Sequence, residues 1–367
     1  MKVLLLGATG AVGRRVAGEL SRAEAVTHLV VSARDSTTLE RVARHLGGAD
    51  RGVFHLKLDL ARASALTEVA PGFDVIASCA GPTHLFEEAN VTAAIGAGTP
   101  YVSLCDDALA VQRILAFNDR AVETGATVVT GCGLSPGLTN FMCRMAASEL
   151  DEVQALGIQV ARSTADAAGP ASLRSFMRTV AGGPPGTGAP SSSGSAAPRP
   201  SFFPDPVGWV ETFGFEHPER ATLHRSFPGL RSVEFRAGLA ETANMDMVRA
   251  IARLGRDDGS GRGSALAQGL LRRLLQRMPA RSAPWTAARV DVMGLHEGKP
   301  LAITYGIVDH LINVAALPLV QATLALGSDK TAAPGVHASD EVFGAKPFLR
   351  SLSRRGLRVA RLEADRV

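Results

Sequence analysis

The feature that most constrains the fold is the turn at residues 7–13, GATGAVG. It follows the short apolar run KVLLL at residues 2–6 and leads into a helix-like stretch, and its glycines are spaced G-x-x-G-x-x-G. Such a turn bends tightly, lets backbone approach a pyrophosphate, and aims helix N–H groups at the anion. The pattern predicts a dinucleotide-binding unit with cofactor contacts along the whole turn, at Gly7, Ala8, Thr9, Gly10, Ala11, Val12 and Gly13.

The end of the next predicted strand bears on the choice of cofactor. The run HLVVSARDS at residues 28–36 ends in Ser32, Ala33 and Arg34, and Asp35 follows. An NAD enzyme usually carries an acidic residue here for the ribose hydroxyls, whereas the planar fork of Arg suits a 2′-phosphate. Arg34 favours NADP, and Asp35 leaves NAD open.

Apolar strands and helix-like stretches continue to alternate through the first third of the chain. Strand-like runs occupy residues 53–60, 73–82, 100–107 and 126–130. This rhythm predicts a doubly wound parallel sheet of the α/β class, a Rossmann-type domain whose ligands bind beyond the carboxyl ends of the strands. We expect Asp59 at the adenine edge and Ala80, Gly81 and Pro82 beside the nicotinamide ribose.

The stretch TGCGLSPGLTN at residues 130–140 leaves the last of these strands on the same edge. Gly131 and Gly133 would let backbone pass close to the nicotinamide end. Ser135 and Pro136 suit the start of a helix whose N–H groups face a substrate. For substrate binding we add Asn140, and Arg174 and His224 as partners of a carboxylate.

Hydride transfer needs orientation and a source of protons. The candidate catalytic residues are His84, Cys105, Asp106 and Asp107, all near predicted strand ends. Each also has a structural explanation: an exposed loop histidine, a small buried thiol, and aspartates that cap a helix. There is no Tyr-x-x-x-Lys pair of the short-chain dehydrogenase kind, and no metal-ligand spacing.

Several motifs in order resemble the saccharopine dehydrogenase-like family, in particular its reductase-type members. They are GATGAVG, VVSAR, CAGP, EEANVTAAIGAGTPYVSL and VVTGCGLSPGLTN, with APGVHASDEVFGAKPFLRSLSRRGLRV near the end. The resemblance implies an NADP-binding domain completed by the last segment, and a middle domain with a mixed sheet that binds substrate and forms a homodimer. The chain departs from many relatives, which have an acidic residue soon after the Tyr-Val of the fifth strand; here Ser103 follows Tyr101 and Val102.

With 367 residues, the chain is too long for one ordinary core. The length predicts two domains. Together with the motifs, the resemblance implies a dinucleotide-binding domain at 1–134, an α+β substrate and dimerisation domain at 135–328, and a returning segment at 329–367. Within the middle domain, residues 288–308 predict a hairpin that turns at His296–Lys299, and residues 264–278 predict a basic amphipathic helix. Residues 181–205 are rich in Gly, Pro and Ser and predict a flexible loop.

Composition narrows the partners and the compartment. A net charge of +4 with 5% aromatic residues argues against nucleic-acid binding. The apolar run at residues 307–326 contains Asp309 and His310 and is a poor membrane span, and the four cysteines show no disulfide framework. We expect a cytoplasmic protein that acts on a small-molecule substrate.

Together these features predict an NADP-dependent oxidoreductase, with NAD possible, that reduces an imine or oxidises an amine on an amine- or amino-acid-derived substrate. Two alternatives stay open. The first is reduction of an enoyl C=C bond, as in some relatives that resemble trans-acting enoyl reductases. The second is a non-catalytic scaffold or sensor that binds NADP(H).

Overall fold

The computed structural model describes residues 1–62, 64–166, 169–180, 197–240, 245–255, 262–277, 283–328 and 332–362. The chain divides into two compact units, each built from two segments. The first unit contains residues 1–140 and 312–357, and the second contains residues 141–311 and 358–367. The sequence placed these divisions at 134 and 328, so the last helix of the predicted middle domain lies instead in the first unit.

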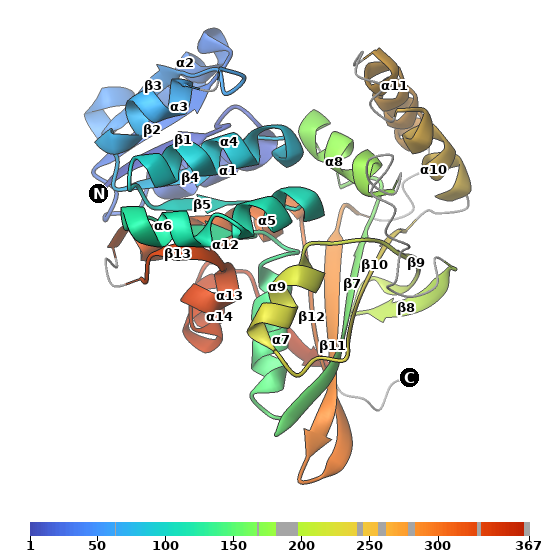
Figure 1. Cartoon of the computed structure of the whole chain (residues 1–367). Coiled ribbons are helices and arrows are strands. Elements are labelled where there is room, and N and C mark those ends of the chain that lie inside the picture. Colours follow the sequence, from blue (N-terminus) through green and yellow to red (C-terminus); the bar gives the residue numbers. More distant parts are fainter. Residues whose placement is uncertain are drawn as a thin grey trace. The chain divides into compact units, whose positions relative to one another are not determined.

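A seven-stranded parallel sheet forms the centre of the first unit (Figure 1). Its strands run in the order β13-β6-β5-β4-β1-β2-β3, as expected for a doubly wound sheet. They are β1 (Lys2–Leu6), β2 (His28–Ala33), β3 (Val53–Lys57), β4 (Val75–Ser78), β5 (Tyr101–Ser103), β6 (Thr127–Thr130) and β13 (Gly335–Ala338). Strands β1, β4 and β6 are almost wholly buried, because helices cover both faces of the sheet.

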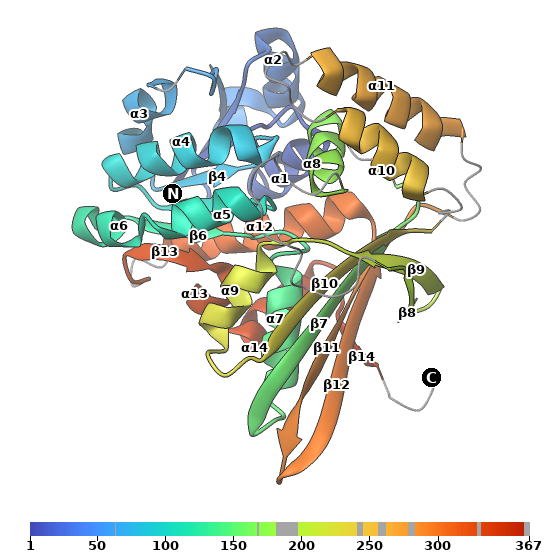
Figure 2. The same ribbon diagram turned by 45° about the vertical axis from the view of Figure 1, so that its right-hand side comes forward.

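The covering helices fall on two sides of this sheet. They are α1 (Ala11–Leu20), α2 (Ser36–His45), α3 (Ala65–Val69), α4 (Thr83–Gly96), α5 (Ala108–Leu115), α6 (Asn118–Thr124), α12 (Leu311–Ser328), α13 (Ser339–Val342) and α14 (Ala345–Arg354). Figures 1 and 2 show α4, α5 and α6 together on one face, with α1 and α12 on the other. Arg355, at the end of α14, pairs with Glu19 of α1 at 2.9 Å and ties the returning segment to the first helix.

The returning segment supplies an edge strand as well as helices. β13 pairs in parallel with β6 over four residues, from Gly335 opposite Thr127 to Ala338 opposite Thr130. Val336 is fully buried in the same hydrophobic cluster as Leu4 and Ile76 of the central strands. The last part of the chain is therefore a structural member of the first sheet.

Among the described residues, α12 alone is long and apolar enough to cross a membrane by length and composition. Its mean hydropathy is 1.6, and half of it is buried inside the protein. Nine of its residues are buried, among them Val314, Leu319 and Val320. A helix packed in this way is the core helix of a folded unit, in keeping with the prediction of a poor membrane span.

A mixed seven-stranded sheet forms the second unit, in the order β14-β12-β11-β7-β10-β9-β8. The strands are β7 (Glu152–Arg162), β8 (Arg199–Phe203), β9 (Gly208–Gly214), β10 (Ser232–Leu239), β11 (Thr286–His296), β12 (Lys299–Asp309) and β14 (Ala360–Leu362). β7 and β10 are parallel, and the other pairs are antiparallel. The helices are α7 (Leu138–Ala147), α8 (Pro170–Val180), α9 (Glu219–Ser226), α10 (Met245–Leu254) and α11 (Arg262–Arg277).

The structure can be compared with several local predictions for the second unit. β11 and β12 form a hairpin whose turn contains Glu297 and Gly298, both with positive φ, as the sequence predicted. The basic helix is α11, which packs on α10 and α8 within its own unit. Residues 199–203 are strand β8 rather than loop, because they pair with β9. Residues 181–196 of the predicted loop lie outside the described residues.

Candidate functional site

The glycine turn between β1 and α1 is shaped by three different demands. Gly7 has φ +75°, and a Cβ there would lie 2.8 Å from the backbone of Cys79. A Cβ on Gly13 would lie 2.2 Å from the carbonyl oxygen of Gly7. At Gly10 the nearest atom is the same oxygen at 3.4 Å. The fold itself therefore requires glycine at positions 7 and 13, and it leaves space beside the backbone at position 10.

The start of α1 is open to an anion. Gly10 is the N-cap of this ten-residue helix, no side chain caps it, and its first turn holds no acidic residue. The amides of the first helical turn therefore keep the hydrogen-bonding capacity and the partial positive charge that bind a pyrophosphate. The cradle at Gly10 and the uncapped helix together fit the diphosphate of a dinucleotide.

Strand β2 ends with its residues committed to different tasks. The hydroxyl of Ser32 is buried and donates to the carbonyl oxygen of Leu5, so Ser32 supports the turn from beneath. Asp35 caps α2: its carboxylate accepts from the amides of Thr37 and Thr38 and from the Thr38 hydroxyl at 2.5 Å, hydrogen bonds that lower the pKa of Asp35. Capping occupies this carboxylate, and the neighbouring Arg34 is exposed.

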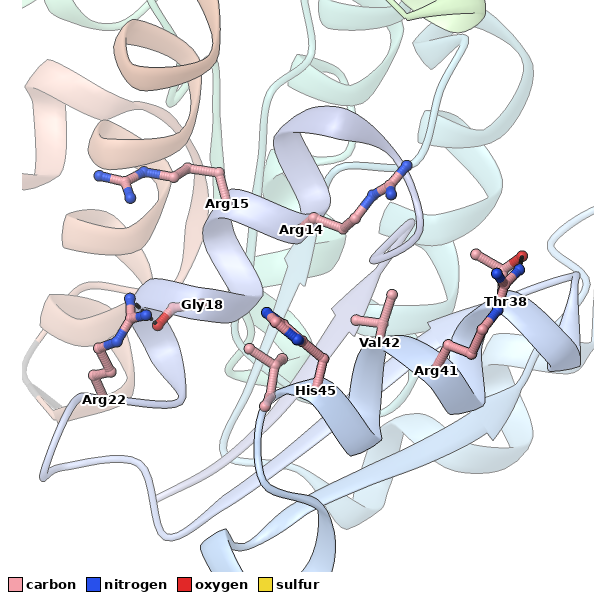
Figure 3. A pocket seen from close by; sticks show the side chains of 9 residues that line it. Arg14, Arg15, Gly18, Arg22, Thr38, Arg41, Val42 and His45 are labelled. Atoms are coloured by element: carbon pink, nitrogen blue, oxygen red, sulfur yellow. Dashed lines mark hydrogen bonds between the residues drawn. The ribbon is translucent and has the colours of Figure 1, made fainter.

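A basic pocket of about 590 Å³ opens between α1 and α2 (Figure 3). Four of the nine described residues that line it are arginines. The nine residues are Arg14, Arg15, Gly18, Arg22, Thr38, Arg41, Val42, His45 and Leu46. None of the nine is acidic. Arg14 lies in the first turn of α1, and Arg41 donates to the hydroxyl of Thr38 in the first turn of α2 at 3.1 Å. Both helices start at the carboxyl edge of the sheet.

The exits of β3 and β4 complete this edge on either side of β1. Asp59 accepts a hydrogen bond from the amide of Ala61 at 3.1 Å and so holds the turn after β3. Ala80 is buried and Pro82 is the N-cap of α4, which no side chain caps. The close approach of Gly7 to Cys79 and Ala80 brings the glycine turn against the β4 exit, as a cofactor that spans both would require.

Three of the four residues predicted as catalytic have structural tasks. Asp107 caps α5 by accepting from the amide of Ala110 at 3.0 Å, and Asp106 accepts from the hydroxyl of Thr83 at 2.9 Å. Cys105 is fully buried, and burial raises the pKa of its thiol well above the ordinary value. Such a thiol packs and does not react at neutral pH. His84 is half-buried in the first turn of α4.

Glu87 of α4 is the titratable residue that sequence reasoning missed. It is 1% exposed, and it accepts hydrogen bonds from Tyr101 and Ser103 of β5. The sequence lacks the acidic residue that many relatives have after Tyr-Val, and here a carboxyl group reaches the same strand from a neighbouring helix. The signal was present: Glu87 shares a helical face with Val91, Ala94 and Ile95, at spacings of four, seven and eight.

The turn after β6 packs closely on itself. Gly131 has φ +68°, and a Cβ there would meet Pro136 at 2.6 Å. A Cβ on Gly137 would lie 2.2 Å from the carbonyl oxygen of Gly133, whereas one on Gly133 would meet nothing nearer than 3.5 Å. α7 begins at Leu138, so Ser135 and Pro136 lie in the turn before the helix and not at its start as predicted. Part of the glycine content therefore serves the turn's own folding.

The predicted substrate residues are divided between the two units. Asn140 is fully buried; its side chain accepts from the amide of Gly137 and donates to Asp340 at 2.9 Å, so it fastens the turn to α13. Arg174 lies on α8 and His224 on α9, both in the second unit. His224 is exposed, with Nδ1 2.7 Å from the carbonyl oxygen of Arg220 one turn earlier. In the described part of the chain, no three His, Cys, Asp or Glu residues form a group that would hold a metal ion.

Comparison with known proteins agrees with this geometry. Residues 3–129 match the family model of the saccharopine dehydrogenase NADP-binding domain. Apo saccharopine dehydrogenase (L-Glu forming) from Saccharomyces cerevisiae superposes with a TM-score of 0.69 at 17% identity, over 99% of this chain and all of that one. At this identity the likeness concerns the fold.

Two curated relatives are similar to this chain over about a third of its length. A protein named as a putative trans-acting enoyl reductase of Mycobacterium tuberculosis is 28% identical over 132 residues, which are 36% of this chain and 32% of that protein. The trans-acting enoyl reductase of Mycobacterium leprae is 26% identical over the same length. The match thus spans about a third of the length of these relatives.

A bare glycine turn that leads into an uncapped helix, on the carboxyl edge of a doubly wound sheet, defines the first unit as a dinucleotide-binding domain. The matched family model makes the dinucleotide NADP. Residues 3–129 are therefore similar to saccharopine dehydrogenase NADP-binding domains, and the fold resembles that of a saccharopine dehydrogenase, as the motifs predicted.

Proposed function

We propose that this chain is an NADP-dependent oxidoreductase that transfers hydride between the nicotinamide and a small-molecule substrate. The observation that carries the proposal is Gly10, a position that the fold leaves open and that begins an uncapped helix within a matched NADP-binding domain. NADP supplies the hydride chemistry when bound, and the protein supplies binding, orientation and proton handling.

Binding of the adenosine half is assigned to the glycine turn and to Arg34, with Arg14 and Arg41 as further partners of the 2′-phosphate. Arginine side chains donate paired hydrogen bonds to phosphate oxygens. None of the residues that line the pocket is acidic, so none of them would repel the phosphate. In this proposal the exits of β4, β5 and β6 hold the nicotinamide half of the cofactor. Ala80, Gly81 and His84 lie at the exit of β4. Arg174 and His224 are kept as candidates for the substrate.

The preferred reaction is reduction of an imine, or oxidation of an amine, on an amine- or amino-acid-derived substrate. Its support is the fold shared over the whole chain with a saccharopine dehydrogenase. Reduction of an enoyl C=C bond is the second candidate, because the curated relatives are named as enoyl reductases. The match to them covers 36% of this chain and 32% of that relative, so it gives this second candidate limited support.

Two experiments test this function. Isothermal titration of the full chain with NADPH and NADH is expected to give tighter binding of NADPH, and the absence of binding of both would refute the proposal. Consumption of NADPH is then followed with a cyclic imine and with an enoyl thioester. Turnover of one substrate selects its reaction, and binding without turnover on a broad panel favours the non-catalytic sensor.

We further infer a cytoplasmic homodimer. The structure describes four cysteines without disulfides, as a reducing compartment requires, and the mixed sheet of the second unit presents partly exposed faces. Light scattering coupled to gel filtration measures the mass of the assembly in solution, and a monomer across the micromolar range would contradict the dimer.

A further inference from the structure

A buried carboxyl group lies beneath the carboxyl edge of the first sheet, and the proposed cofactor contacts do not use it. Glu87 on α4 is 1% exposed, and Tyr101 and Ser103 of β5 are fully buried against it. The phenol of Tyr101 donates to Oε2 at 3.1 Å, and the hydroxyl of Ser103 donates to Oε1. Each carboxyl oxygen is therefore matched to one hydroxyl group of the adjacent strand.

The surroundings of Glu87 bring its change of charge close to neutral pH. Burial raises the pKa of Glu87 to about 7, with repulsion from Asp106 acting in the same direction, against the two hydrogen bonds that lower it. None of these groups is a cation. Its titratable neighbours across β5 and the β6 exit are Tyr101, Cys105 and Cys132, and burial together with Glu87 raises the pKa of each.

Ser103 connects this carboxyl group to the edge where the cofactor is expected. Its hydroxyl oxygen accepts from the amide of Cys105 at 3.4 Å, and its carbonyl oxygen accepts from the amide of Cys132 at 2.8 Å. An ionised Glu87 accepts from both hydroxyls, whereas a protonated one must donate its own O–H. One of the two hydroxyls then has to turn, and a turn at Ser103 changes the support of residues 104–107.

We propose that Glu87 is a positioning residue, which couples its own protonation to the conformation of residues 104–107 and thereby to binding of the nicotinamide half of the cofactor. The coupling within the sheet edge stands on the burial of Glu87 and its hydrogen bonds; the effect on the cofactor rests on the proposed function. Asp106, which closes the same turn by accepting from Thr83 at the start of α4, is the group through which the change reaches the β4 exit.

The first test compares ligands that cover different parts of the edge. Dissociation constants of NADPH and of 2′,5′-ADP are measured from about pH 6 to about pH 8 for the wild type, E87Q, S103A and E88Q. The control residue Glu88 is exposed on the same helix and pairs with Arg113. In the wild type and E88Q we expect NADPH to bind about fivefold more weakly at the acid end, relative to 2′,5′-ADP.

The variants E87Q and S103A are expected to lose this relative change, because Gln does not titrate and Ala cannot relay. Both ligands carry the 2′-phosphate, so its titration cancels in the ratio of their dissociation constants. The 5′-phosphate monoester of 2′,5′-ADP titrates near pH 6 as well, but it does so equally with all four proteins, so the effect of Glu87 is the difference between the variants. An E87Q variant that keeps the relative pH dependence would overturn the coupling to the cofactor.

A second measurement needs no cofactor. Hydrogen exchange of the peptide that spans residues 103–107, corrected for the intrinsic effect of pH, is expected to change across neutral pH in the wild type and E88Q but not in E87Q. Equal profiles in all three proteins would refute the coupling within the sheet edge. If that coupling is present and the wild type binds no NADPH, the proposed function fails while the conformational role of Glu87 stands.

Discussion

The three glycines of the first turn have different surroundings. Replacing each one with alanine is therefore expected to affect stability and cofactor binding differently. Gly10→Ala meets only one atom, at 3.4 Å, so we expect its melting temperature to stay close to that of the wild type. Its Cβ would stand where the pyrophosphate approaches, and we expect NADPH to bind about tenfold more weakly or worse. Gly13→Ala is the contrast, since its Cβ would collide with Gly7 and unfold the turn. Thermal melts and fluorescence titrations measure the two effects, and unchanged affinity in Gly10→Ala would contradict the assignment.

The arginines of the basic pocket act at the same scale but on the choice of cofactor. Removing Arg14 or Arg41 deletes a charged donor near the 2′-phosphate, so NADPH affinity should fall about tenfold or more while NADH affinity stays unchanged. Arg44→Ala is a matched control, because Arg44 lies on the same helix and pairs with Glu40 outside the pocket. Equal losses for both cofactors would mean that these arginines do not read the 2′-phosphate.

Glu87 also makes stability depend on pH. Its carboxyl pKa is about 7 in the folded chain and about 4.5 in an ordinary setting, so the folded chain binds more protons between these values. Stability is therefore expected to fall as pH rises through that window, by up to about 3 kcal/mol from this group. In E87Q this contribution is absent. The free energy of unfolding of E87Q, compared with that of the wild type at the same pH, should therefore rise towards pH 8. Urea denaturation at several pH values checks this, and parallel curves would contradict it.

At the scale of elements, the turn between β6 and α7 shows what its glycines are for. A Cβ on Gly137, where φ is +134°, would lie 2.2 Å from the Gly133 carbonyl oxygen. We expect Gly137→Ala to cost about 1–3 kcal/mol or more, and Gly133→Ala to cost much less. Chemical denaturation of the two variants measures the difference. Similar losses for both would mean that the turn does not pack as described.

The same elements show where sequence reasoning succeeds. Period and turn chemistry identified the strands and the glycine turn, because a buried parallel strand and the helix after it leave a local pattern. The hairpin around Glu297 and Gly298 was predicted for the same reason. Glu87, Arg14 and Arg41 were missed because their importance depends on contacts with another strand or helix. The tasks of Asp35 and Cys105 likewise depend on neighbours, namely the α2 amides and a buried cluster.

At the scale of the molecule, the first unit is built from two separate segments of the chain. We expect it to bind the cofactor only when both segments are present. Residues 1–140 alone lack β13, α12 and the pair between Arg355 and Glu19. We expect this fragment to bind 2′,5′-ADP poorly, because β6 is left as an open edge and the core loses Val336. Joining residues 1–140 to 312–357 through a flexible linker should restore binding. A fragment 1–140 that binds as well as the full chain would contradict the structural role of the returning segment.

Because β6 pairs with β13, the sheet of the cofactor domain can be completed only late in the synthesis of each chain. β6 ends at Thr130, and its partner begins at Gly335. A ribosome that adds about 5–20 residues per second needs roughly 10–40 seconds to cover that interval. For that time the nascent chain carries an apolar strand with one side unpaired, a state that invites pairing with another chain. We therefore expect growing cells to hold a chaperone-dependent pool of incomplete chains, in which strands β7 to β12 of the second sheet have been synthesised before the first sheet is closed.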